Sequence, residues 1–376
     1  MTATYDRFDS KPSALKREVG LLVGLPTLLF FLLLGKDWLS SLSGWTLPLF
    51  FFVWLFVAML WLSFGVVHHA DCLAVKLGEP YGTLILTLSV ISIEVVMISM
   101  VMLTGADNPT LGRDMMFAVL MIVLNGLVGL SLLVGARRHR EQVHNLQGAN
   151  TFLIVLITLA MFTLILPNFT QSTEAGTYSK GQMVFAIAVS VCLYGAFLVA
   201  QTLRYRGYFK APGANEEDHY DHGDLVIRSI GYHATLLVAN MVPIVLLSKG
   251  MAKVIDYQIA SLNAPAAIGG VFIAILVLSP EGFAAVKAAW ANHLQRSINI
   301  CLGSALATIG MTVPAILAIG LMTGNKVVLG LDPVESILLA TTSLIAVVTF
   351  SSDKTTSIHG LVHFILFIAY FYMIFD

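Results

Sequence analysis

Charged residues are scarce in this sequence, and their scarcity is its most informative feature. Only 11% of the 376 residues are Asp, Glu, Lys or Arg, whereas 57% are hydrophobic. A soluble domain of average composition carries about 25% charged residues, so most of the surface of this chain faces something other than water. The net charge of −1 offers no basic field to nucleic acid, and we expect no nucleic-acid partner.

Cysteine is also scarce, with only Cys72, Cys192 and Cys301, which are far apart in the sequence. There is no Cys-x-x-Cys pair, and no combination of cysteine and histidine has the spacing of a zinc site. The sequence therefore predicts neither a disulfide framework nor a resident metal, and we expect no cofactor.

Long apolar runs are what the sequence has in quantity. A run of about 20 apolar residues is long enough to cross a lipid bilayer as a helix. We count eleven such runs and predict an all-α polytopic membrane protein. The expected spans lie near 20–35, 46–67, 81–105, 114–136, 151–169, 182–203, 226–248, 265–290, 298–322, 335–350 and 359–375.

The distribution of Lys and Arg predicts the orientation of these spans. If the N-terminus is cytoplasmic, most of the Lys and Arg residues lie in cytoplasmic loops, as the positive-inside rule requires. After eleven crossings the C-terminus lies outside. We therefore expect a multi-pass membrane protein, in contact with the lipid bilayer.

The longest cytoplasmic loop, 204–225, divides the chain. Its acidic run at 215–222 lacks the spacing of a calcium-binding EF-hand, so we interpret the loop as a solvated linker. The predicted organisation is a cytoplasmic segment at 1–19, an extra membrane helix at 20–36, a five-helix unit at 46–203, the linker at 204–225 and a second five-helix unit at 226–376.

An internal repeat relates the two units. In the second helix of each unit, a glycine is followed ten residues later by a serine and twelve residues later by a glutamate. The residues are Gly82, Ser92 and Glu94 in the first unit and Gly269, Ser279 and Glu281 in the second. Because each unit has an odd number of helices, the second enters the membrane in the opposite orientation, and we predict an inverted repeat.

Glu94 and Glu281 are each about a dozen residues into an apolar helix, near the middle of the bilayer. A carboxylate at that depth must be protonated or paired, and no Lys or Arg lies at a comparable depth. Protons and bound cations remain as the neutralising partners. Carboxylate oxygens suit hard cations such as Ca²⁺ or Na⁺, so we predict that both glutamates bind a cation or protons in turn.

Neighbouring residues are candidates for supporting roles. We expect Pro280 and Gly282 to break the helix beside Glu281 and free carbonyl ligands there. Candidate accessory ligands are Asn125, Ser304, Ser92 and Ser279, and candidate proton-relay or pH-sensing residues are His233, His68, His69 and Glu79. Each has a structural alternative: contacts between helices, bonds to backbone carbonyls, or a buried or interfacial polar cluster.

Three classes of function use buried glutamates in this way. A channel usually builds its filter from a symmetric ring of several chains. An intramembrane enzyme needs an activated nucleophile or metal ligands nearby, and neither HExxH nor GxSxG occurs. An antiporter that works by alternating access fits an inverted repeat within one chain, and we favour it. The oligomeric state does not follow from the sequence.

Four stretches resemble the calcium/cation antiporter superfamily, and specifically the bacterial ChaA-type calcium (sodium, potassium)/proton antiporters. They are residues 78–94, 123–129, 279–282 and 294–310. The resemblance implies one extra helix plus two inverted five-helix repeats, with Glu94 and Glu281 as the ion-binding acids. It also implies export of Ca²⁺, Na⁺ or K⁺ in exchange for protons across a bacterial inner membrane, with the C-terminus periplasmic. The residues rank none of these three cations above the others.

Overall fold

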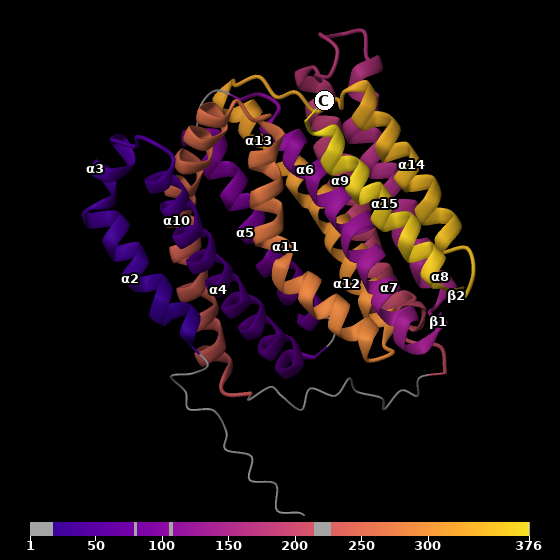
Figure 1. Cartoon of the computed structure of the whole chain (residues 1–376). Coiled ribbons are helices and arrows are strands. Elements are labelled where there is room, and N and C mark those ends of the chain that lie inside the picture. The colour runs from indigo at the N-terminus through magenta and orange to yellow at the C-terminus, as the bar shows by residue number, and fades with distance from the viewer. Residues whose placement is uncertain (1–17, 79–80, 105–107, 214–226, 376) are drawn as a thin grey trace, which may run out of the picture.

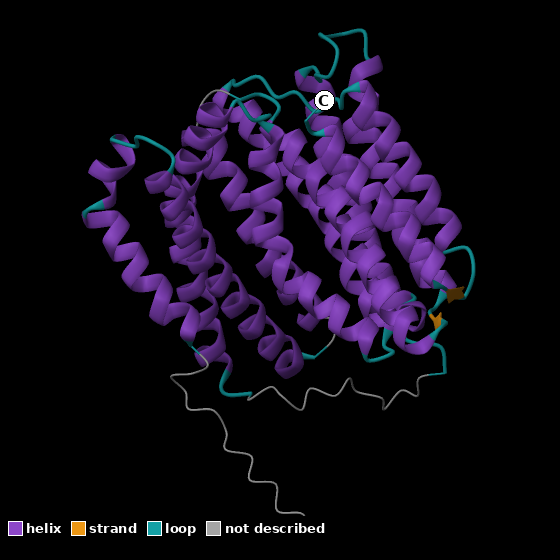
Figure 2. Cartoon of the chain, in the orientation of Figure 1, coloured by secondary structure: helices purple, strands orange, loops and turns teal. Residues whose placement is uncertain are grey.

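The computed structural model describes residues 18–78, 81–104, 108–213 and 227–375. Within these ranges the chain is helical except for loops and two strands of two residues each (Figure 2). Glu79 and the acidic run at 215–222 lie outside the described residues. The predicted all-α class is confirmed.

The helices follow one another along the whole described chain. They are α2 (Val19–Leu33), α3 (Gly35–Ser40), α4 (Thr46–Leu77), α5 (Tyr81–Thr104), α6 (Leu111–Met121), η1 (Ile122–Leu127), α7 (Val128–His139), α8 (Leu146–Ala160), η2 (Met161–Ile165), η3 (Leu166–Phe169), α9 (Lys180–Val199), η4 (Ala200–Arg204), η5 (Arg206–Phe209), α10 (Ile230–Leu262), α11 (Ala267–Trp290), α12 (Leu294–Ala307), η6 (Thr308–Thr312), α13 (Val313–Thr323), α14 (Pro333–Thr349) and α15 (Ser357–Met373). The turns η1, η2, η4 and η6 are π-helical and continue the helices beside them.

Seven of these helices, counted through their π-helical turns, are long and apolar enough to cross a membrane. Four shorter apolar helical stretches lie at 19–33, 87–100, 333–349 and 357–373. Together they give eleven apolar segments among the described residues, and each overlaps one of the eleven predicted spans.

The helix ends follow local sequence signals. Asp332 and Thr356 form capping boxes at the starts of α14 and α15, and Ser179 does so at the start of α9. In a capping box the side chains at both positions bond backbone N–H groups that have no partner within the helix. At the other end, Gly324 takes the left-handed conformation after α13, with φ 77°.

Two helices are much longer than predicted. The expected span 46–67 corresponds to α4, which continues to Leu77, and the expected span 226–248 corresponds to α10, which continues to Leu262. Beyond residue 248 the charged side chains are exposed on one face, whereas Met251, Val254 and Ile255 are buried on the other. The charges end the uniformly apolar run but leave an apolar stripe at helical spacing, and this stripe keeps the helix packed.

The helices form a bundle with three regions (Figure 1). At one edge α2, α4 and α10 contact one another. At the other edge α15 contacts both α7 and α14. Between them lie α5, which contacts α4 and α10, and α12, which contacts α7, and α11 contacts helices of both edges. Close packing at the second edge depends on Gly129, where an added Cβ atom would lie 2.8 Å from the backbone nitrogen of Phe364.

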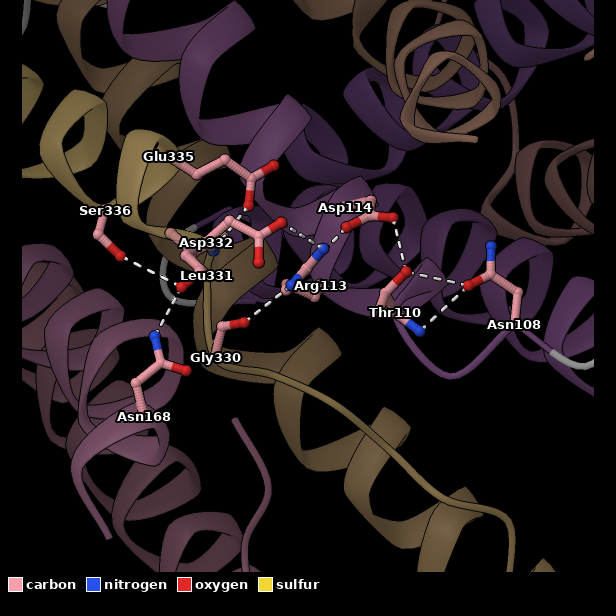
Figure 3. A network of polar contacts seen from close by, with 10 residues as sticks. All are labelled: Asn108, Thr110, Arg113, Asp114, Asn168, Gly330, Leu331, Asp332, Glu335 and Ser336. Atoms are coloured by element: carbon pink, nitrogen blue, oxygen red, sulfur yellow. Dashed lines mark hydrogen bonds and ion pairs between the residues drawn. The ribbon is translucent and has the colours of Figure 1, made fainter. Parts of the chain in front are cut away.

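A polar network joins the first half of the chain to the second at the start of α6 (Figure 3). The guanidinium group of Arg113, which is 8% exposed, donates to the carboxylate of Asp114 at 2.8 Å and to the carbonyl of Gly330 at 2.9 Å. It also lies 3.5 Å from the carboxylate of Asp332, just before α14. Because this charge is largely desolvated, it needs all of these acceptors, and they tie the two segments together.

At the other end of α6–η1–α7, two short strands join the same halves. Strand β1 (Gln142–Val143) pairs antiparallel with β2 (Lys354–Thr355). The next residue, His144, donates its backbone N–H to Asp353 and packs its ring against Phe350. The ring is 1% exposed, and neither of its nitrogens has a hydrogen-bond partner among the described residues. Burial lowers the pKa of His144 from 6.5 to about 4.

The buried His144 ring predicts a loss of stability in acid. Its folded-state pKa lies below the unfolded value of 6.5, so the unfolded chain binds the proton more readily. The free energy of unfolding should be unaffected above pH 6.5 and fall by up to about 3 kcal/mol between pH 6.5 and about pH 4. The His144→Leu variant should not show this loss of stability between pH 6.5 and about pH 4. The test is the unfolding temperature of the purified protein against pH, with the exposed His293→Leu as control. The same acid sensitivity in all three proteins would contradict the prediction.

Candidate functional site

Glu94 lies on α5 and is 3% exposed. Its carboxyl group accepts a hydrogen bond from the Thr308 hydroxyl at 2.8 Å and a second from the Thr312 hydroxyl at 3.3 Å. Both threonines lie in the π-helical turn η6, in the second half of the chain. The first-half glutamate is therefore held by second-half hydroxyl groups.

Glu281 lies on α11 and is partly exposed. Its carboxyl group accepts a hydrogen bond of 2.7 Å from the hydroxyl of Ser304, on α12. The carboxyl groups of Glu94 and Glu281 are close enough to interact electrostatically, and Glu281 also interacts with Asp71 of α4. The structure thus brings the two predicted acids together and adds a third acid near them.

The three hydroxyl groups that contact the glutamates form a ladder along one helix. Ser304, Thr308 and Thr312 follow one another at intervals of four residues, which places them on the same face of α12–η6. Ser304 contacts Glu281, and Thr308 and Thr312 contact Glu94. We call these three residues the hydroxyl ladder. A hydroxyl group can donate to a carboxylate and still accept or coordinate through its lone pairs, so the ladder suits a site whose occupant changes.

The π-helical turn in the ladder has a local cause. Pro314 has no N–H group and therefore cannot bond the carbonyl of Gly310 as an α-helix requires. The backbone widens to a π-helical turn just before the proline. Such single turns disturb the regular hydrogen bonding of a helix and are frequent at functional sites.

The predicted helix break beside Glu281 is wrong. Helix α11 runs without interruption from Ala267 to Trp290 with Pro280 inside it. A proline removes only one backbone bond, and packing on several sides retains the helix here. Gly282 serves packing instead, because an added Cβ atom would lie 2.7 Å from the Leu127 side chain in η1. The irregular backbone occurs in the facing helices, at η1 and η6.

Of the four candidate accessory ligands, Ser304 alone hydrogen-bonds a glutamate in the described structure. Ser92 and Ser279 donate to the carbonyls of Leu88 and Ile275, each four residues earlier in its own helix. Both serines therefore bond backbone carbonyls, which is the structural alternative to a ligand role.

Asn125 is fully buried in η1 and bonds away from the glutamates. Its amide N–H donates to the Thr342 hydroxyl at 2.8 Å, and its oxygen lies 3.1 Å from Nδ1 of His363 on α15. Because the amide oxygen can only accept, the His363 hydrogen is on Nδ1, and Nε2 accepts from the Thr349 hydroxyl at 3.0 Å. Asn125 thus has the role of a polar contact between helices here.

The histidine candidates fall outside the glutamate site but form a cluster of their own. His69 and His233 lie 3.0 Å apart through their Nδ1 atoms, between α4 and α10. His68 stands beside them on α4, with its ring centroid 5.2 Å from that of His69.

Sequence reasoning missed Thr308, Thr312 and Glu18, which bonds His69. A signal for the threonines was present, because hydroxyl residues recur every fourth position from Ser304 through an apolar helix. No comparable signal identified Glu18, which precedes the first membrane helix.

The bundle of membrane helices, with Glu94 and Glu281 brought to the same helix, defines a multi-pass membrane protein with a polar site between its two halves. The sequence model of the family described as sodium/calcium exchanger protein matches residues 47–203 and again residues 232–375. These matches cover well over half of the chain, which therefore belongs to this family.

Two curated relatives cover most of this chain. The sodium-potassium/proton antiporter ChaA of Escherichia coli is 39% identical over 315 residues, which are 83% of this chain and 85% of the relative. The putative ionic transporter y4hA of Sinorhizobium fredii is 42% identical over 311 residues, 81% of this chain and 83% of the relative. Membership of an exchanger family speaks against the channel and enzyme alternatives.

Solved structures share the fold. The structure of native YfkE superposes with a TM-score of 0.72 at 16% identity and covers 96% of this chain and 99% of that one. The structure of the H⁺/Ca²⁺ exchanger CAX gives a TM-score of 0.67 at 16% identity, with 96% and 91% covered.

Proposed function

We propose that this chain is a secondary active transporter that exports Ca²⁺, Na⁺ or K⁺ from the cytoplasm of a bacterium in exchange for protons. The observation that carries the proposal is the convergence of Glu94 and Glu281, from different halves of the chain, on one hydroxyl ladder. Family membership supports it, as does the 39% identical relative, which is named a sodium-potassium/proton antiporter.

The chemistry of the site follows from two acids in a poorly hydrated place. Two ionised carboxylates that interact with each other repel, so the empty, ionised site is costly. Protons or a cation remove that cost, and either occupant excludes the other because both use the same oxygen atoms. Because the empty state is rare, the site seldom becomes accessible from the other side of the membrane without an occupant. The proton flux and the cation flux are therefore coupled.

The ligands available at Glu94 and Glu281 are oxygen atoms. The carboxyl groups are bonded by neutral hydroxyl groups of Ser304, Thr308 and Thr312. An all-oxygen set of this kind suits hard cations and offers nothing to soft thiophilic metals.

Alternating access is proposed to use two inverted five-helix repeats, at 46–203 and 226–376, with the helix at 20–36 outside them and the segments 1–19 and 204–225 in the cytoplasm. The two separate matches of one family model support this division. An odd number of helices in each repeat gives opposite orientations, and rocking between them would open the site to each side in turn. The N-terminus is cytoplasmic and the C-terminus periplasmic in this arrangement, as the Lys and Arg distribution favours.

The function is tested in everted membrane vesicles that hold a proton gradient. Ca²⁺, Na⁺, K⁺ and Mg²⁺ are added in turn to vesicles with and without this protein. Collapse of the gradient by one or more cations, only where the protein is present, would support exchange and name the cation. No collapse by any cation, with the protein demonstrably in the membrane, would overturn the proposal.

A further inference from the structure

A hydrogen-bonded chain of titratable side chains crosses the contact between α2, α4 and α10, outside the glutamate site. Glu18 immediately precedes α2, His69 is on α4 and His233 is on α10. The two Nδ1 atoms of the histidines are 3.0 Å apart, and Nε2 of His69 is 3.2 Å from the Glu18 carboxylate. Both imidazole rings are 1% exposed. These side chains therefore link α4 and α10 to the start of α2, and the three helices lie side by side (Figure 1).

The direction of each hydrogen bond follows from the groups at the ends of this chain. The backbone N–H of Arg228 donates to Nε2 of His233 at 2.9 Å, so that nitrogen carries no hydrogen. A neutral His233 then has its hydrogen on Nδ1 and donates to Nδ1 of His69. His69 in turn has its hydrogen on Nε2 and donates to Glu18. With both rings neutral, every ring nitrogen has a partner.

Adding one proton breaks this series of hydrogen bonds at one point. The two ring nitrogens without hydrogen are Nε2 of His233 and Nδ1 of His69, and each already faces an N–H group. A proton on either one sets two donors against each other. The Glu18 carboxylate favours the proton on His69, where a charged ring gains an ion pair. The bond between His69 and His233 is then lost, while the bond between His69 and Glu18 is strengthened.

Other charged and titratable groups face the pair from each helix around it. They are Glu18 before α2, His68, Cys72 and Lys76 on α4, Tyr232 on α10, and Arg228 just before α10. Tyr232 donates to the second oxygen of Glu18 at 3.1 Å and so fixes the carboxylate next to His69. The Glu18 carboxylate favours the first added proton, whereas a second would place two like charges on rings whose Nδ1 atoms are 3.0 Å apart, with Lys76 also nearby. The pair therefore takes up a single proton.

We propose that His69 and His233, together with Glu18, form a proton-binding site that regulates transport and is separate from Glu94 and Glu281. Protonation frees α10 from α4 at this end of the bundle and ties α4 to α2. In the proposed repeats α4 and α10 are the equivalent first helices, so their contact influences the rocking of one repeat against the other. In the proposed orientation this cluster lies at the cytoplasmic face. Acid on that face slows exchange, which limits proton entry when the cytoplasm is already acidic. This consequence rests on the proposed function, whereas the proton-linked hydrogen bond does not.

The hydrogen bond is tested without transport, by NMR of the purified protein labelled with ¹⁵N at histidine. At neutral pH, His233 should be protonated at Nδ1 only and His69 at Nε2 only. Signals are assigned by their loss in His69→Gln and His233→Gln. In acid, His69 should gain a second proton while His233 stays neutral. Opposite tautomers, or two rings that both stay neutral or both become charged through the imidazole range, would overturn the proposal.

The regulation is tested with purified protein in proteoliposomes, by varying pH on the face of the cluster. Wild-type exchange should fall as the pH drops through the imidazole range, roughly pH 8 to 5. His69→Gln, His233→Gln and Glu18→Gln should keep the alkaline rate and move the midpoint by about one pH unit or more. The exposed His293→Gln is the matched control and should not move it.

Two transport results would overturn the regulatory site. In the first, the variants keep the wild-type pH profile. In the second, they lose the same share of the exchange rate at every pH, which is the result expected if these residues were an obligatory proton relay. A wild-type protein with no exchange at any pH would instead reject the proposed function. The NMR titration would still decide whether the proton-linked bond exists.

Discussion

Replacing Glu94 or Glu281 with glutamine is expected to reduce the rate of cation/proton exchange by at least about a hundredfold. This corresponds to the loss of about 3 kcal/mol of interaction by a paired charge in a poorly hydrated site. Glutamine has nearly the same shape, and its carbonyl oxygen can accept the same hydroxyl hydrogen bonds. It cannot release a proton or neutralise a cation. The loss should therefore come from chemistry, while the helix packing around both positions is retained.

The measurement is initial exchange rate in proteoliposomes at matched protein density. Glu174→Gln is the control, because Glu174 is 77% exposed and bonds Lys326 at the surface. Size-exclusion profiles and unfolding temperatures of all variants should match the wild type. Exchange at the wild-type rate from either Glu94→Gln or Glu281→Gln would contradict the assignment of that residue.

Removing the Thr308 hydroxyl is expected to raise the apparent KM for the cation about tenfold or more. Thr308 makes the shorter of the two hydroxyl bonds to Glu94, at 2.8 Å, in a place with almost no access to solvent. A hydrogen bond to a charged group is worth about 1.5–3 kcal/mol, and valine preserves the shape of the side chain without the bond. The ionised carboxylate that binds the cation is then less favourable.

Thr308→Ser restores a hydroxyl group and should restore most of the affinity. Thr312→Val should have a smaller effect, because its bond is longer, at 3.3 Å. Thr158→Val is the matched control on an exposed part of α8, where the hydroxyl bonds only its own helix. An unchanged KM for Thr308→Val, or no rescue by serine, would contradict a role for the hydroxyl ladder at Glu94.

The membrane helices could be predicted from the sequence because the bilayer imposes a length and an apolar composition on them. The last two spans, expected at 335–350 and 359–375, agree with α14 and α15 to within two residues at each end. Prediction failed for the end of α10, where packing against neighbouring helices continues the helix beyond its apolar run. The apolar run alone does not reveal that packing.

The two glutamates could be identified from the sequence as site candidates because an acid is costly to bury in an apolar membrane helix and is seldom retained there without a functional role. Their partners could not, because Thr308 and Thr312 come within hydrogen-bond distance of Glu94 only through the way α5 packs against η6. Threonine is common in apolar helices and usually bonds its own backbone, as Thr158 does. Pro280 was misjudged for a related reason, since local sequence suggests a break that the surrounding helices prevent.

Asn125 illustrates a third limit. Its residue type suits a cation ligand, yet its amide is used by Thr342 and His363 from helices near the end of the chain. Those contacts span more than 200 residues of sequence, and no local pattern indicates them. The same applies to the hydrogen bonds from Glu18 through His69 to His233, because these residues lie in three well-separated parts of the sequence.

The most direct test of a site shared by protons and cations counts the protons that leave when a cation binds. Calorimetric titration of the purified protein in buffers of different ionisation enthalpy gives this number without any transport. We predict release of about one to two protons per cation bound near neutral pH, and a smaller number in Glu94→Gln and in Glu281→Gln. Cation binding with no proton release, or with the same release in the double glutamine variant, would contradict the account.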